Sequence, residues 1–166
     1  MLRGSSAFYP EGVVDVGILV VSLFRNPLQE AAADFLASVL LQRRRAAIPV
    51  TAVLGAFHVA TRYLRLPPLE VKKMLGEMLE TGSPAFYPYV RPEDALDALE
   101  YAVYYRVESW DGYLVRLARS IGSNIVYTLD EELRRVEGLL VVNPFPRELV
   151  EQYHEYIRSR LRGSTV

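Results

Sequence analysis

Three aspartates stand at positions where α/β proteins often gather ligands, namely the ends of buried strands and the start of a helix. Asp15 ends the apolar run Val13-Val14, and Asp130 follows Thr128-Leu129, so each should leave the carboxyl end of a strand. Asp111 should lie on the first turn of a helix. Open α/β sheets place their ligand sites at the carboxyl edge. We therefore expect the three carboxylates to meet there.

Three carboxylates in one place repel one another unless a cation neutralises them. Oxygen ligands alone suit a hard cation, which favours Mg²⁺ or Mn²⁺. Such an ion promotes hydrolysis by activating water and by offsetting charge on a phosphate. The pattern therefore predicts metal-assisted hydrolysis of a phosphodiester, with Asp15, Asp111 and Asp130 as metal ligands and catalytic residues.

Strand-like and helix-like segments alternate along the whole chain. Short apolar runs indicate strands, whereas apolar residues recurring every three or four positions indicate helices. An alternation of this kind predicts an α/β fold with a parallel sheet covered by helices on both faces. The expected strands are 12–16, 46–50, 86–90 (at a sheet edge, because of Pro88), 124–128 and 139–142. The expected helices are 18–25, 27–44, 51–64 (capped by Thr51), 67–80, one opened by Pro92 that carries Ala95, Leu96, Leu99 and Val103, 109–121 (capped by Ser109), 131–136 and 146–162.

Length and composition indicate one domain of residues 1–166, with a core over about 12–144 and a C-terminal helix over about 146–162. An apolar fraction of 51% predicts a sizeable core, and no run approaches the length of a membrane span. The first residues lack the apolar centre of a signal peptide, and both chain ends should fray. The absence of cysteine excludes disulfides and thiolate chemistry, so a cytoplasmic location is expected.

Over roughly residues 12–144, the chain resembles the PIN domain family, and within it the small VapC-like toxins. The matching segments are Val13-Val14-Asp15, Ile48-Pro49-Val50, Trp110-Asp111-Gly112-Tyr113-Leu114, Ile125-Val126-Tyr127-Thr128-Leu129-Asp130 and Val141-Val142-Asn143-Pro144. The resemblance implies a three-layer α/β/α sandwich with a mainly parallel sheet. It also implies a metal-dependent ribonuclease with four acidic site positions.

Asp15, Asp111 and Asp130 match three of those positions, and Thr128 matches a hydroxyl beside the last one. The fourth acid, a glutamate on the helix after Ile48-Pro49, is replaced by Gly55, and no acid occurs between Asp34 and Glu70. Gly17 also departs from the family, which has a small hydroxyl or amide residue there. His58 lies three residues after Gly55 and can face the same way on a helix, as a substitute ligand or as ordinary structure.

The predicted function is a divalent-metal-dependent ribonuclease, the toxin of a toxin–antitoxin pair. The alternative is a PIN-like domain without activity that binds RNA or protein, in which the aspartates persist as helix caps. RNA, an antitoxin protein and a second copy of the chain are the expected partners. The dimer surface would be the apolar stripe Leu69, Met74, Leu75, Met78 and Leu79 together with a tyrosine-rich region.

Other side chains near the aspartates have competing interpretations. Trp110 is expected to be a core anchor. The tyrosines at 101, 104, 105 and 113 suit core or interface packing better than base stacking. Either Arg116 or Arg119 could reach a bound phosphate. The net charge of −1 offers nucleic acid no overall attraction, so any such contact must be local.

Overall fold

The sheet at the centre of the fold has five parallel strands in the order β3-β2-β1-β4-β5. The computed structural model describes residues 9–163, and the predictions of frayed ends and no signal peptide fall mainly outside that range. The strands are β1 (Gly12–Val14), β2 (Ala46–Pro49), β3 (Phe86–Tyr87), β4 (Ile125–Tyr127) and β5 (Leu140–Val142). The short β3 pairs only with β2, which confirms its place at the edge.

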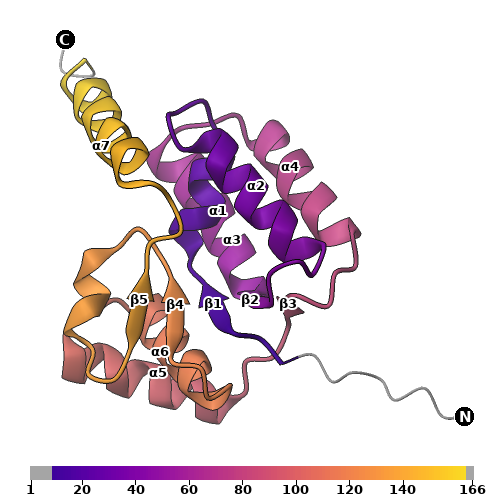
Figure 1. Cartoon of the computed structure of the whole chain (residues 1–166), viewed down its shortest axis with the longest axis vertical. Helices are drawn as coiled ribbons and strands as arrows, with labels where there is room; N and C mark the ends of the chain where they lie inside the picture. Colours follow the sequence, from indigo (N-terminus) through magenta and orange to yellow (C-terminus); the bar gives the residue numbers. More distant parts are fainter. Residues whose placement is uncertain (1–8, 164–166) are drawn as a thin grey trace, which may run out of the picture.

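Helices cover both faces of this sheet, so the predicted three-layer α/β/α arrangement is confirmed (Figure 1). Successive strand residues point to opposite faces. Val14 and Tyr127 join a core with α1 (Val16–Ser22), α2 (Gln29–Leu40), α3 (Val50–His58) and α4 (Pro68–Glu80). Val13 and Val126 join a second core with α5 (Pro92–Tyr105) and α6 (Ser109–Ser120).

Two predicted helix caps were wrong by one residue or more. Thr51 lies inside α3, which begins at Val50 after Pro49, and its side chain forms no cap. Ser109 is the first residue of α6, and Glu108 occupies the N-cap position. The second shift matters for the site because it places Asp111 at the third position of the helix, with Glu108 three residues before it.

Two short helices complete the predicted pattern near the carboxyl edge. The helix that begins as α3 continues as the π-helical turn η1 (Val59–Tyr63), and β4 leads into the 3₁₀ helix η2 (Glu131–Arg135). The last helix, α7 (Arg147–Arg162), extends away from the sheet (Figure 1). Of the helices described, none combines the length and the apolar content that crossing a bilayer requires.

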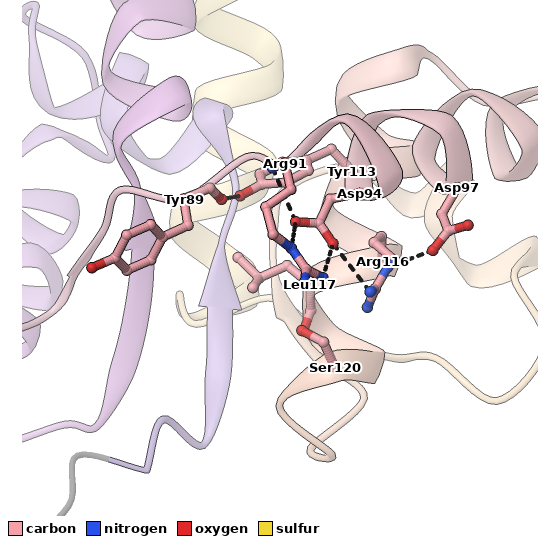
Figure 2. Close-up of polar contacts among 8 residues, drawn as sticks. All are labelled: Tyr89, Arg91, Asp94, Asp97, Tyr113, Arg116, Leu117 and Ser120. Carbon is pink, nitrogen blue, oxygen red and sulfur yellow. Dashed lines mark hydrogen bonds and ion pairs between the residues drawn. The ribbon is translucent and has the colours of Figure 1, made fainter.

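Helix α6 is held unusually close to α5, and this contact positions Asp111. A Cβ on Gly112 would lie 2.1 Å from the carbonyl oxygen of Ala98, so only glycine allows this approach. A network of ion pairs continues the contact (Figure 2): Arg116 reaches Asp94 at 3.1 Å and Asp97 at 2.7 Å. The predicted phosphate contact for Arg116 is therefore not favoured, because its guanidinium joins the two helices.

Candidate active site

A cleft of about 670 Å³ lies at the carboxyl ends of β1 and β4, and it brings the three predicted aspartates together. Asp15 directly follows β1 and Asp130 follows β4, two strands that pair with each other. Asp111 enters from the first turn of α6. The volume falls within the range of roughly 300–1,000 Å³ that is usual for ligand pockets.

Asp15 is the most enclosed of these acids, with only 8% of its surface exposed. Its Oδ1 accepts the backbone N–H of Val16 at 2.6 Å, which caps α1, and its Oδ2 accepts the hydroxyl of Thr128 at 2.6 Å. Burial raises the pKa of Asp15 and outweighs these two hydrogen bonds, with further repulsion from Asp130 and Glu108. The carboxylate is therefore fixed in position but costly to ionise.

Thr128 connects two of the acids. Its buried hydroxyl donates to Asp15 and accepts the backbone N–H of Asp130 at 2.9 Å. Asp130 in turn caps η2 by accepting the N–H of Glu132 at 2.8 Å. One hydroxyl thus links the carboxylate of Asp15 to the backbone of Asp130. This is a supporting position consistent with the sequence prediction for Thr128.

Asp111 is half-buried in the cleft. Burial, followed by repulsion from Asp15, Asp130 and Glu108, raises the pKa of Asp111 to about 7. The backbone N–H of Glu108 opposes this shift only in part. The electrostatic result matches the expectation that several acids in one place destabilise one another's charge.

Glu108 is a fourth acid of the cleft, and the sequence prediction did not include it. It is exposed at the N-cap of α6, and its side chain makes no capping hydrogen bond there. The signal that could have found it is its spacing. Residues three apart on a helix share a face, so an acid three positions before Asp111 belongs to the same side.

Gly55 lines the cleft as the sequence prediction requires, at the position where the resemblance places a glutamate. A Cβ there would lie 3.2 Å from Cγ2 of Val16, a tight but side-chain contact. Gly17 lines the cleft as well. At Gly17 and Gly55 the wall formed by α1 and α3 therefore presents backbone, whereas the acids come from the strand ends, the N-cap of α6 and its first turn.

Aromatic side chains form part of the wall. His58, Tyr63 and Trp110 all line the cleft, and the His58 and Tyr63 rings meet edge-to-face with centroids 5.8 Å apart. The prediction that Trp110 anchors the core is wrong, because 53% of its surface is exposed. The tyrosines predicted for packing at 101, 104, 105 and 113 are not among the residues that line the cleft.

Arg119 also serves structure rather than the cleft. Its guanidinium lies 4.7 Å from the ring centroid of Tyr101 and donates to the hydroxyl of Tyr105 and the carbonyl of Glu137. With Arg116 paired to α5, both arginines suggested as phosphate contacts are engaged elsewhere. The cleft as described is acidic and aromatic.

Comparison with known proteins returned no matching family model and no matching curated protein. Within residues 9–163, no group of three or more histidine, aspartate and glutamate side chains has an arrangement that could hold a metal ion. The four acids share one cleft but are not gathered tightly around one point. Their oxygen donors suit a hard cation that keeps part of its water shell.

Proposed function

We propose that this protein is a divalent-metal-dependent ribonuclease of the PIN type, the toxin of a toxin–antitoxin pair acting in the cytoplasm. The observation that carries the proposal is the convergence of Asp15, Asp111 and Asp130 in one cleft at the carboxyl edge of a parallel sheet. Ligand sites in open α/β folds lie at this edge of the sheet. The proposal depends on these site residues, because a fold by itself does not imply an activity.

The donor set fits Mg²⁺ or Mn²⁺ better than a softer metal, since carboxylate oxygens predominate in the cleft. One or two carboxylates with several waters suffice for Mg²⁺, which is consistent with acids that are spread around the cleft. A bound ion would supply Lewis acidity and an activated water. Asp15 and Asp130 are held in register by Thr128, whereas Asp111 is carried on the α5-supported helix α6.

His58 has a more modest role in this proposal. Its ring contacts Tyr63 in the cleft wall, so it contributes to the shape of the wall whether or not it also ligates. Gly55 presents no side chain to the cleft, and a Cβ there would lie 3.2 Å from Cγ2 of Val16. In this proposal Glu108, at the N-cap of α6, supplies the fourth acid that α3 lacks.

The alternative function is a binding module without catalysis. The observation that favours it is the lack of a compact group of metal-ligating side chains in the described part of the chain. On this alternative, Asp15 and Asp130 serve as the caps of α1 and η2, a role that both do fulfil. RNA or an antitoxin would then be bound without being cleaved.

An RNA cleavage assay distinguishes the two functions. A labelled single-stranded RNA is incubated with the protein and Mg²⁺ or Mn²⁺, with a chelator as the blank. We expect ion-dependent cleavage that Asp111→Asn reduces by at least a hundredfold, while Asp34→Asn, an exposed change on α2, has no effect. Equal cleavage by wild type and Asp111→Asn, or no cleavage with any ion, would refute the nuclease.

We also propose a homodimer, which keeps the tyrosine-rich part of the surface that the sequence indicated, on α5, but not the stripe on α4. On α4, Leu75 is buried, Met74 and Met78 pack partly against the core, and only Leu69 and Leu79 are exposed. Helix α5 instead exposes an apolar stripe at helical spacing, Leu96, Leu99 and Val103. An exposed stripe of this kind is the more suitable contact for a second copy.

A further inference from the structure

Two of the exposed aromatic side chains in the described residues lie in the acidic cleft. Tyr63 is 73% exposed and Trp110 is 53% exposed, and both line the cleft with the aspartates. Large aromatic side chains usually gain stability by burial, so two open rings in one hollow are unusual for a purely structural role. Their position suggests that a ligand covers them.

The two rings approach from opposite layers of the sandwich. Tyr63 ends η1, whose neighbouring residues pack in the core with α1–α4, whereas Trp110 stands on α6, which packs in the other core. Asp15 and Asp130 leave the sheet edge between these layers. A nucleotide whose phosphate lies at the acids therefore has an aromatic surface on either side for its base.

Local contacts restrain the ring of Tyr63 and the backbone of Trp110. His58 packs edge-to-face against Tyr63, with an interplanar angle of 77°. Trp110 immediately precedes Asp111 at the helix start, where the α5–α6 contact restrains the backbone. A ring that is held before binding loses less freedom when a base stacks on it.

We propose that Tyr63 and Trp110 form a stacking subsite for unpaired nucleobases beside the acids of the cleft. This inference rests on the proposed function, since the phosphate chemistry supplies the neighbouring position. Bases in a duplex have both faces covered by their neighbours, whereas bases in loops and single strands can stack on protein rings. The cleft therefore discriminates by the availability of a base face.

Because the sequence contains one tryptophan, Trp110 is its own fluorescent reporter. Wild-type protein in Mg²⁺ is titrated with a twelve-nucleotide 2′-O-methyl RNA, with the same strand lacking its four central bases, and with the strand annealed to its complement. Chromatography after each titration checks that the probes are intact. We expect the intact single strand to quench Trp110 and to bind at least about tenfold more tightly than the other two probes.

Variants separate stacking from a general effect on the fold. With a dye-labelled probe and anisotropy detection, Tyr63→Ala and Trp110→Ala should each weaken single-strand binding about tenfold, as expected for one lost base–aromatic stack. Tyr63→Phe and Trp110→Phe keep a ring and should bind as wild type does. The base-lacking strand should bind the alanine variants and wild type equally.

Three results would overturn the subsite: equal affinity for the intact and base-lacking strands, unchanged binding by both alanine variants, or no binding of the single strand to folded protein. Failure of the nuclease proposal can be distinguished from failure of the stacking subsite. A protein that binds with quenching but never cleaves RNA keeps the subsite and loses the activity. A protein that cleaves RNA but ignores base removal keeps the activity and loses the subsite.

Discussion

Replacing Asp111 with asparagine should stabilise the protein at pH 8, because it removes one charge from a crowded cleft. The pKa of Asp111 is raised from 3.8 to about 7 by burial and by repulsion from Asp15, Asp130 and Glu108. Between these two pH values the folded state holds a proton that the unfolded chain has released. The free energy of unfolding therefore falls as the pH rises from about 4 to about 7, and it levels off above that.

The size of the effect follows from the shift. One pKa unit corresponds to about 1.4 kcal/mol, so a shift of this size would contribute roughly 4 kcal/mol if no solvent reached the group. Asp111 is only half-buried, and water and salt screen part of the repulsion, so about 2 kcal/mol is the expected penalty at pH 8. For a chain of this length that is a difference in melting temperature of about 6 °C.

Thermal unfolding of wild type and Asp111→Asn at pH 4, 5, 6, 7 and 8, without divalent ions, measures this penalty. We expect equal melting temperatures at pH 4 and a growing advantage of the variant up to pH 8. Asp34→Asn is the matched control, because it makes the same chemical change on the exposed face of α2. Adding Mg²⁺ at pH 8 should raise the melting temperature of wild type more than that of Asp111→Asn.

The opposite sign would refute the reasoning. An acid at the third position of a helix can stabilise the helix start by up to about 1 kcal/mol. If that role dominates, Asp111→Asn will melt at a lower temperature than wild type at pH 8, and the difference will vanish on acidification. Such a result would mean that the repulsion among the cleft acids is small.

The remaining predictions concern the cleft wall, the helix contact and the dimer. Gly55→Glu should bind Mn²⁺ at least tenfold more tightly than Gly55→Gln in calorimetry, and equal affinities would contradict the placement of a fourth ligand there. Glu108→Gln should weaken Mn²⁺ binding several-fold without lowering stability; an unchanged affinity would remove this residue from the site. Gly112→Ala should cost about 1–3 kcal/mol in urea unfolding, because its Cβ meets the carbonyl of Ala98, and an unaffected midpoint would disprove the close contact. Light scattering should give twice the chain mass of 18.8 kDa for wild type. Replacing a residue of the exposed α5 stripe with glutamate, for example Leu99→Glu, should reduce the mass to that of the monomer. A monomeric wild type would exclude the dimer.

The sequence was sufficient to predict the layers of the fold. Apolar runs of strand length alternate with helical periodicity, and a parallel sheet with helices on both faces is the arrangement that buries all of them. The positions of Asp15 and Asp130 followed from the same pattern, since a residue after a parallel strand must lie at the carboxyl edge. The helix starts were less predictable. A capping preference at Thr51 or Ser109 is a weak signal, and tertiary packing can move the start of a helix by one or two residues.

The exposure of Trp110 shows what periodicity omits. Tyr113 and Leu114, three and four residues later, are buried, so helical phase places Trp110 on the same side of α6. The helical period tells which side of the helix a residue faces. It does not tell how far along the helix the sheet extends. The first turn of α6 lies at the cleft, so a side chain with the correct phase meets solvent instead of a strand. The acid Glu108 was missed for a related reason, because it precedes the helix rather than ending a strand.

Capping of a helix start explains Asp15 and Asp130 one at a time, but it does not explain why both lie in one acidic cleft. Asp15 caps α1 and Asp130 caps η2, and asparagine or serine would cap either helix without adding a charge. A carboxylate also has more acceptor sites than one capping bond uses, so the cap leaves capacity for a ligand. Charges that served only as caps would be more stable apart, because proximity raises the cost of ionising Asp111 and Asp15. Carboxyl groups at both caps, with Asp111 and Glu108 in the same cleft, therefore form the kind of acidic group that the proposed cation would stabilise.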